Sequence, residues 1–295
     1  MLNVLVKDER FHNLIDTEQE IFDWGDFGGF VEGLIWSNID CDLTFNTLGN
    51  KKTWRLYCDG NSELLREETN IANGMAYDAD YNMIICEQIG YRLARSDRDL
   101  KKYEIIADSF DGKPFNSPND VVVHSNGTIY FTDPHYGRRP TRHGRFSSQP
   151  QARQRVYGIR PKTGELFIAT EETNTPNGIC FSLDESKVFF AETTTYEISE
   201  MDVNDDGTFS GRKVLAVTPD LGHGGPDGIK LDNFGNIWCC AQGGIQIYTQ
   251  DGAFLGLLRT PAASGNLCFG GKDGHTLFFG ADSRMMSVRT KVKRP

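Results

Sequence analysis

The sequence predicts an all-β fold, a six-bladed β-propeller with a metal site in its central channel. Two observations lead to this prediction: a hairpin pattern recurs six times along the chain, and long amphipathic helices are absent. With 31 glycines and 24% charged residues among 295, the chain has the composition of a globular protein rich in turns. No domain boundary is evident, so we expect residues 1–295 to form a single domain.

The repeat is clearest at residues 117–134, which read SPNDVVVHSNGTIYFTDP. A turn residue and a polar residue come first, followed by an apolar strand, a turn rich in Asp, Asn and Gly, and a second apolar strand. The other copies lie at residues 30–47, 71–88, 175–193, 225–242 and 263–282. A unit of about 40–50 residues in an all-β sequence is typical of one four-stranded propeller blade.

The ring of blades must close between the two ends of the chain. The last copy begins at residue 263 and leaves about 30 residues, which is room for roughly three strands. We expect the N-terminal strand near LNVLV, residues 2–6, to supply the fourth strand of this last blade.

The third position of each copy is polar in five copies of the six. In a propeller the first strand of each blade lies innermost, so these positions should converge at one mouth of the channel. They are Glu32, Asn73, Asn119, Asn177, Asp227 and Gly265. A set of carboxylate and amide oxygens without His or Cys suits a hard divalent cation such as Ca²⁺, Mg²⁺ or Mn²⁺.

The two carboxylates of this set strengthen the metal prediction. Glu32 and Asp227 would neutralise one divalent cation, whereas two carboxylates held close together without a cation would force one of them to take up a proton. The alternative is that Asn and Asp simply occupy turn positions, as they do in any β protein. That alternative explains poorly why a polar residue recurs at the same register in five copies.

Four of the copies carry motifs of a known family. The motifs EGLIW (32–36), PNDVVV (118–123), PNGICF (176–181) and PDGIKLD (226–232) occur in this order and at blade spacing. Together they resemble the gluconolactonase and senescence-marker-protein (regucalcin-like) family. The resemblance covers roughly residues 30–290 and implies a six-bladed propeller hydrolase with one divalent metal at the channel mouth.

The resemblance also implies roles for individual residues. The metal ligands of the family fall on Glu32, Asn119, Asn177 and Asp227. Its substrate-side positions fall on Asn73 and Asn119. Sugar lactones are the usual substrates of the family, and some relatives hydrolyse organophosphates.

We therefore predict an enzyme that hydrolyses a sugar lactone to the aldonic acid with one divalent metal ion. Ca²⁺ is favoured as the ion, with Mn²⁺, Zn²⁺, Mg²⁺ and Fe²⁺ as alternatives. Asp227 is the predicted catalytic residue, because a carboxylate beside the metal can act as general base toward water; a role as nucleophile stays open. Two other functions stay open, a phosphotriesterase of the same fold and a calcium-binding propeller without turnover.

A long basic loop, residues 133–155, follows the second strand of the third copy and contains six Arg and two His. Loops after second strands should return to the mouth that carries the ring. We predict that His135 and Tyr136 bind the substrate there, and a solvated loop without such contacts is the alternative. Four arginines of the loop would favour an acidic product or a phosphorylated substrate: Arg138, Arg139, Arg142 and Arg145. Residues after other second strands are expected on the same face: Glu87, Gln88, Glu192, Gln242 and Asp282.

The resemblance implies a small-molecule lactone as the partner. The chain is expected to be a monomer or a small homo-oligomer. A net charge of −10 argues against nucleic acid. No apolar run of 18 residues and no signal peptide are evident, so we expect no membrane partner and a cytoplasmic location. The seven cysteines are odd in number and form no CxxC, which favours free thiols over a disulfide framework or a metal cluster.

Overall fold

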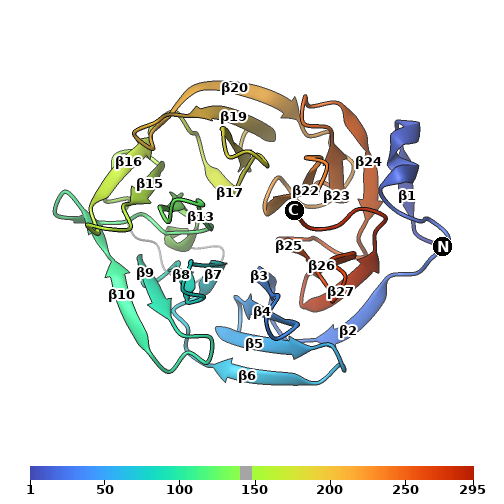
Figure 1. Ribbon diagram of the computed structural model, residues 1–295, viewed down its shortest axis with the longest axis horizontal. Coiled ribbons are helices and arrows are strands. Elements are labelled where there is room, and N and C mark those ends of the chain that lie inside the picture. The colour runs from blue at the N-terminus through green and yellow to red at the C-terminus, as the bar shows by residue number, and fades with distance from the viewer. Residues whose placement is uncertain (140–147) are drawn as a thin grey trace.

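The computed structural model describes residues 1–139 and 148–295. Six antiparallel sheets are arranged around a central axis, each with its first strand innermost (Figure 1). The protein is therefore a six-bladed β-propeller, as predicted.

The blades are numbered in chain order. Blade 1 consists of β3 (Val31–Ser37), β4 (Asp42–Thr47), β5 (Lys52–Tyr57) and β6 (Ser62–Arg66). Blade 2 consists of β7 (Ala72–Tyr77), β8 (Met83–Glu87), β9 (Arg92–Ser96) and β10 (Tyr103–Ala107). Blade 3 consists of β13 (Val121–Val123), β14 (Ile129–Asp133), β15 (Arg155–Ile159) and β16 (Leu166–Thr170). Blade 4 consists of β17 (Pro176–Phe181), β18 (Lys187–Glu192), β19 (Glu197–Val203) and β20 (Phe209–Val217).

The last two blades include strands from the N-terminal segment. Blade 5 consists of β21 (Ile229–Leu231), β22 (Ile237–Ala241), β23 (Gly244–Tyr248), β24 (Phe254–Arg259) and β1 (Val4–Val6). Blade 6 consists of β25 (Leu267–Gly270), β26 (Thr276–Ala281), β27 (Arg284–Arg289) and β2 (Phe22–Asp26). The remaining elements are a small hairpin and two 3₁₀ helices: β11 (Ser109–Phe110), β12 (Lys113–Pro114), η1 (Glu9–Asn13) and η2 (Tyr136–Arg138).

An N-terminal strand completes blade 6, but it is not the one expected near residues 2–6. β2 pairs with β27, whereas β1 pairs with β24 as a fifth, outermost strand of blade 5 (Figure 1). The chain reaches blade 6 only after η1, whose Phe11 is fully buried beside Gly256 of β24. The apolar residues near the N-terminus thus cover blade 5 before the ring closes.

The core lies between neighbouring blades. Each second strand is covered on both faces, and β8 (MIICE) and β22 (IWCCA) are buried along their whole length. Side chains of adjacent blades pack together, as Val31 and Phe45 of blade 1 do with Phe278 and Met285 of blade 6. Burial of each large apolar side chain contributes about 1.5–3 kcal/mol. This burial explains the continuous apolar runs in β8 and β22, whereas β4 (DLTFNT) also buries Asp42, Thr44 and Asn46.

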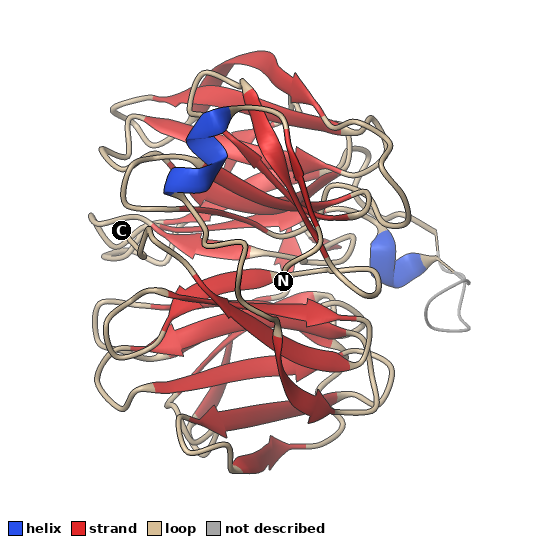
Figure 2. Ribbon diagram, turned by 90° about the vertical axis from the view of Figure 1, so that its right-hand side faces the viewer, coloured by secondary structure: helices blue, strands red, loops and turns tan. Residues whose placement is uncertain are grey.

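The ring residues lie on the same face of the propeller as η2. β13 begins beside the end of β14, with Val121 opposite Phe131, and η2 directly follows β14. In the side view η2 and the C-terminus lie on opposite faces of the molecule (Figure 2). The inner strands thus begin on the face that carries η2 and end on the face that carries the C-terminus.

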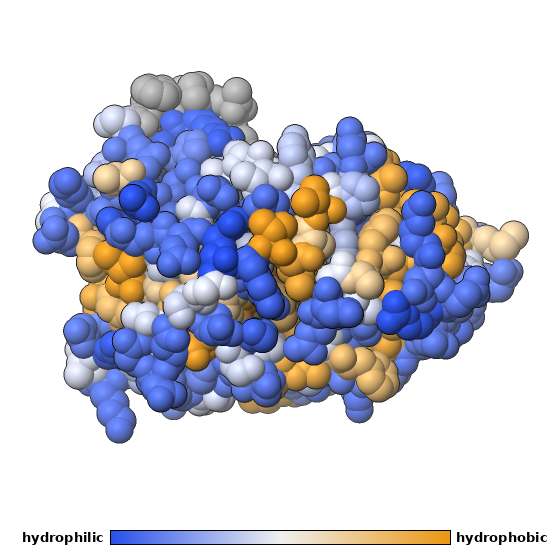
Figure 3. Space-filling model, turned by 90° about the horizontal axis from the view of Figure 1, so that it is seen from above, coloured by the Kyte–Doolittle hydropathy of each residue, from blue (hydrophilic) through white to orange (hydrophobic). Residues whose placement is uncertain are grey.

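The outer rim carries both polar and apolar residues, and the apolar ones reach the surface in separate areas (Figure 3). On β20, for example, Val214 is 43% and Val217 is 65% exposed. All seven cysteines are free thiols, as predicted. Among the residues that the structure describes, no helix is long and apolar enough to cross a membrane.

Candidate active site

Three asparagines form one half of a ring at the channel mouth. Nδ2 of Asn73 donates a hydrogen bond to Oδ1 of Asn119 at 2.8 Å, and Nδ2 of Asn119 donates one to Oδ1 of Asn177 at 3.0 Å. All three side chains are buried. The amides therefore lie in a continuous row across blades 2, 3 and 4, although they are far apart in the sequence.

Asp227, Gly265 and Glu32 form the other half of the ring. The N–H of Gly228 donates a hydrogen bond to the carbonyl oxygen of Gly265 at 2.7 Å. A Cβ added to Gly265 would lie 2.6 Å from Oε1 of Glu32. The Glu32 carboxylate therefore occupies space that a side chain at position 265 would fill. Glu32 is 2% exposed, whereas Asp227 is partly exposed.

Close backbone approaches join the two halves. A Cβ on Gly33 would lie 1.8 Å from the carbonyl oxygen of Asn73, and one on Gly178 would lie 2.3 Å from that of Asp227. Gly33 also has a φ of +60°, a backbone conformation that residues with a side chain rarely adopt. Glycine after a ring residue thus lets the next blade approach closely, and the six predicted positions converge as expected.

The donor set of the ring fits a hard divalent cation. An amide oxygen that accepts one N–H keeps a second lone pair, so Asn119 and Asn177 can still bind a cation. Oδ1 of Asn73 is buried and accepts no hydrogen bond from the residues described. Within residues 1–139 and 148–295 no group of three or more His, Cys, Asp or Glu could hold a metal ion. A cation at the ring would therefore depend on the amides as well as on the two carboxylates.

Thr193 supports the ring and was missed by the sequence analysis. Its hydroxyl accepts a hydrogen bond from Nδ2 of Asn177 at 2.9 Å and donates one to the carbonyl oxygen of Pro226 at 2.6 Å. It thereby links blade 4 to the residue that precedes Asp227. The signal was present in the sequence, because Thr193 directly follows the second strand of the fourth copy.

Replacing Thr193 with valine is expected to lower the free energy of unfolding by about 1–2 kcal/mol, because both hydrogen bonds are lost at similar volume. We expect kcat/KM for the substrate to fall by roughly 10-fold, since Pro226 loses its support beside Asp227. Urea denaturation and a hydrolysis assay measure the two effects. Thr195→Val, at an exposed position of the following turn, is the control. Wild-type values for Thr193→Val would mean that the bridge has no role.

Three carboxylates on this face, Asp133, Glu192 and Glu87, hold the segments that precede ring residues. Asp133, at the end of β14, accepts hydrogen bonds from the N–H groups of Asn116 (2.8 Å) and Ser117 (2.7 Å). These residues precede Asn119, so the carboxylate fixes the turn that aims this ring residue. Burial raises the pKa of Asp133 to about 7, against the two N–H donors, which lower it.

Glu192 repeats this arrangement in blade 4, whereas Glu87 of blade 2 accepts a side-chain amide. Oε2 of Glu192 accepts hydrogen bonds from the N–H groups of Asn174 and Thr175, both at 2.9 Å, ahead of Asn177. Oε2 of Glu87 accepts one from Nδ2 of Asn70 at 3.0 Å, ahead of Asn73. Both carboxylates are fully buried, so they position the ring rather than contact a substrate.

Other residues expected on this face differ in their contacts. The side-chain amide of Gln88 is fully buried, and neither its oxygen nor its nitrogen is hydrogen-bonded to a described residue. Oε1 of Gln242 accepts a hydrogen bond from Thr218 at 2.9 Å. Asp282 is exposed at the end of β26.

Tyr136 and His135 lie at the start of the long loop, as predicted. Tyr136 is 5% exposed, and its hydroxyl donates a hydrogen bond to the carbonyl oxygen of Thr175 at 3.3 Å. Burial raises the pKa of Tyr136 to about 12, and the charge of Asp227 adds to this rise. Tyr136 is thus a neutral hydroxyl close to the predicted catalytic carboxylate.

Comparison with known proteins decides the family. The family described as SMP-30/Gluconolactonase/LRE-like region matches residues 30–282, a range that contains all six ring positions. The chain belongs to this family.

Named relatives of this SMP-30/gluconolactonase family member include a gluconolactonase of Zymomonas mobilis. It is 31% identical over 230 residues, and the match spans 75% of this chain but only 64% of the Zymomonas protein. The solved structure of a gluconolactonase from Xanthomonas campestris has a TM-score of 0.89 at 27% identity and covers 97% of this chain and 94% of its own. The calcium-binding protein regucalcin from Agrobacterium tumefaciens has a TM-score of 0.76 at 17% identity, with 93% and 94% coverage, and shares the fold.

In this member of the SMP-30/gluconolactonase family, Arg138 anchors the long loop. The sequence predicted a different role, in which Arg138 favours an acidic product or a phosphorylated substrate. It is 7% exposed, and Nη2 donates a hydrogen bond to the carbonyl oxygen of Phe115 at 2.7 Å. Its guanidinium lies 3.7 Å from the ring centroid of Tyr91. These contacts use the donors that would have met an anionic substrate. Arg142 and Arg145 lie outside the described residues.

His135 is held between two side chains. Its Nε2 accepts a hydrogen bond from Nε of Arg139 at 2.8 Å, and Nδ1 contacts Oε1 of Gln154. Burial lowers the pKa of His135, and the charge of Arg139 lowers it further, against the opposing effect of Gln154. The neutral imidazole is therefore the form that fits this arrangement.

The stability of the loop anchor should depend on pH through His135. Because its pKa is lowered in the folded state, the unfolded state takes up a proton first as the pH falls below about 6.5, and folding stability is lost there. We expect the fall in Tm between pH 7.5 and 5.5 to be smaller in His135→Asn than in wild type. The same substitution at the exposed His12 controls for the loss of an imidazole. Parallel pH profiles for wild type and His135→Asn would contradict this assignment.

Proposed function

We propose that this protein hydrolyses a sugar lactone to the aldonic acid with one divalent metal ion, most readily Ca²⁺. The observation that carries the proposal is the convergence of two carboxylates and three side-chain amides at one channel mouth, with Asp227 partly exposed among them. The named gluconolactonases among the relatives support the choice of substrate class.

The residues that would hold the cation are Glu32, Asn119, Asn177 and Asp227. When bound, it would polarise the lactone carbonyl as a Lewis acid and stabilise negative charge on that oxygen. Asn73 and Asn119 are the proposed substrate contacts in the ring. His135 and the neutral hydroxyl of Tyr136 are the proposed contacts from the loop.

Asp227 is the proposed general base. Its carboxylate takes a proton from the water that attacks the carbonyl carbon. The bond between this carbon and the ring oxygen then breaks, and the proton passes to the leaving alkoxide, which becomes a hydroxyl group. The product is the open-chain acid, so one water is consumed and no other reactant is required.

Two alternatives share the same ring. A phosphotriesterase would use the same cation and Asp227 on a phosphorus centre. A calcium-binding propeller without turnover would keep the cation enclosed. The partial exposure of Asp227 beside buried Glu32 favours an open coordination position and hence an enzyme.

Acid release from a panel of aldono-lactones tests this proposal. The protein is freed of metal with a chelator and then assayed with Ca²⁺, Mn²⁺, Zn²⁺, Mg²⁺ or Fe²⁺, and a phosphotriester is assayed in parallel. We expect lactone turnover that the chelator removes and that an added cation restores. Ca²⁺ binding without turnover of any lactone would support the binding protein, and turnover of the phosphotriester alone would support the phosphotriesterase.

We also propose a cytoplasmic location. All seven cysteines are free thiols, and five of them are buried, as in proteins of reducing compartments. Recovery of the protein with the cytoplasmic fraction of lysed cells tests this location.

A further inference from the structure

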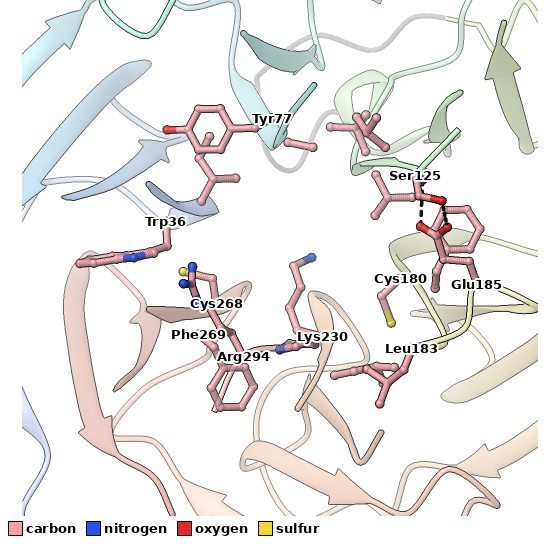
Figure 4. Close-up of a pocket in the computed structure, with 18 of the residues that line it drawn as sticks. Trp36, Tyr77, Ser125, Cys180, Leu183, Glu185, Lys230, Cys268, Phe269 and Arg294 are labelled. Carbon is pink, nitrogen blue, oxygen red and sulfur yellow. Dashed lines mark hydrogen bonds between the residues drawn. The ribbon is translucent and has the colours of Figure 1, made fainter. Parts of the chain in front are cut away.

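A cavity lies at the end of the channel opposite the ring. It has a volume of about 780 Å³ and is lined by the far ends of the inner strands and the turns that follow them (Figure 4). Trp36, on its wall, stands four residues after Glu32 in β3, which corresponds to about 13 Å along the strand. The cavity is therefore separate from the ring and opens on the face of the C-terminus.

The walls of this C-terminal cavity are mostly apolar. Aromatic and aliphatic side chains come from five blades, including Trp36, Met75, Val122, Phe181 and Phe269. Two thiols complete the wall, those of Cys180 and Cys268. Burial raises the pKa of both thiols to about 12, so they remain protonated and weakly polar. Such a surface gives few hydrogen-bond partners to a polyol.

One ammonium group projects into this apolar space. Lys230 of β21 extends into the middle of the cavity (Figure 4), and its side chain is 27% exposed. Burial lowers the pKa of Lys230, but Asp120 and the nearby thiols of Cys180, Cys268 and Cys240 together outweigh this effect, so the pKa lies above its usual value. The group is thus charged at neutral pH.

The ion pair with Asp120 leaves the hydrogen-bond donors of the Lys230 ammonium group available. Nζ lies 3.7 Å from Oδ2 of Asp120, beyond hydrogen-bond distance, and makes no hydrogen bond to another residue in the described ranges. The Asp120 carboxylate already accepts hydrogen bonds from the N–H groups of Val121 (2.9 Å) and Ile179 (3.2 Å). The ammonium group therefore keeps donors available to a ligand in a cavity with mostly apolar walls.

Arg294 adds a positive charge to the lining, and the two acidic groups at the rim are held by hydrogen-bond donors of the protein. Glu185 is held by Ser125, whose N–H and hydroxyl both donate to it, as Figure 4 shows. Asp184 accepts hydrogen bonds from the hydroxyls of Ser182 and Ser186. Both acidic groups are thus engaged with donors at the edge, while Lys230 occupies the centre.

We propose that the C-terminal cavity binds a small apolar molecule with a single carboxylate, which meets Lys230 while its apolar tail packs between the inner strands. The volume lies within the range of about 300–1,000 Å³ that ligand sites occupy. A charge-assisted hydrogen bond in apolar surroundings supplies affinity and orientation. This site does not depend on the proposed lactonase activity.

Isothermal titration with octanoate and octan-1-ol tests the proposal, because the two molecules share a tail and differ in charge. Wild type should bind octanoate at least 10-fold more tightly than octan-1-ol. In Lys230→Met this preference should disappear, and in Lys230→Arg it should stay within about 3-fold of wild type. Equal affinities of wild type for the two molecules would overturn the proposal.

Lys230→Met leaves the buried Asp120 without its cation and could unfold the protein. Leu183→Ala is therefore the second variant, because Leu183 lines the cavity, is 48% exposed and is not part of the core. This substitution should weaken the binding of octanoate and of octan-1-ol alike, by about 2–3-fold, at unchanged Tm. Unchanged binding in Leu183→Ala, or gluconate binding as tightly as octanoate, would overturn the assignment of the cavity and its ligand class.

Discussion

Changing Asp227 to asparagine is expected to lower kcat for lactone hydrolysis by about 10²–10⁴-fold, the usual contribution of a general base. The fold should persist. The N–H of Asp227 donates to the carbonyl oxygen of Cys240 at 2.9 Å, and this backbone contact is independent of the side chain. Asparagine also has nearly the same volume as aspartate, and the position is partly exposed.

Asp227 is also a proposed metal ligand, so the assay must separate the two roles. Turnover is therefore measured at saturating cation, and the Kd of the cation is measured independently by calorimetry. Asp282→Asn is the matched control: Asp282 is exposed on the same face, and its φ of 53° is readily adopted by asparagine. Wild-type kcat in Asp227→Asn at saturating cation would exclude Asp227 as the base.

The ring positions could be predicted from sequence because they occupy one register of a repeated hairpin. Asn119 and Asp227 each stand two residues before an inner strand, and Asn177 stands at the start of one. Sixfold repetition turns this register into a common place in space, so residues 50 or more positions apart meet. Their roles as ligands remain predictions, because convergence does not establish what they bind.

The closure and the anchoring of the long loop could not be predicted, because they depend on partners far away in the sequence. β2, which closes blade 6, reads FDWGD and is largely exposed, so it has no apolar alternation to identify it. Arg138 is buried, where it donates a hydrogen bond to the carbonyl oxygen of Phe115 and lies over the ring of Tyr91. Composition alone suggested a free cation in a basic loop, and only the tertiary structure supplies these acceptors.

Asp120 shows the same limit within a repeat. Most strong copies have glycine after the ring residue, and the sequence does not explain the carboxylate in the third copy. In the structure it accepts N–H groups from Val121 and from Ile179 of the next blade, and it is the counter-ion of Lys230 from blade 5. Three blades thus meet at one carboxylate inside the channel.

Replacing Gly265 with alanine is expected to weaken Ca²⁺ binding at least 10-fold without altering any proposed ligand. The added Cβ would lie 2.4 Å from Cε1 of Phe30 and 2.6 Å from Oε1 of Glu32, so the Glu32 carboxylate must move. Overpacking of this kind should also lower the free energy of unfolding by about 1–3 kcal/mol. Calorimetry with Ca²⁺ and urea denaturation measure the two effects.

Gly225→Ala is the matched control for this substitution. Gly225 lies two residues before Asp227. A Cβ added to Gly225 would lie 3.4 Å from its nearest neighbour, Cγ2 of Thr193, which is an ordinary contact. Its Ca²⁺ affinity and stability should therefore stay close to wild type. If folded Gly265→Ala also kept the wild-type affinity, Glu32 would not be a ligand, and the cation would have to rest on Asp227 and the amides alone. Loss of Ca²⁺ binding in Gly265→Ala but not in Gly225→Ala would instead indicate that the Glu32 carboxylate, for which Gly265 leaves room, binds the cation.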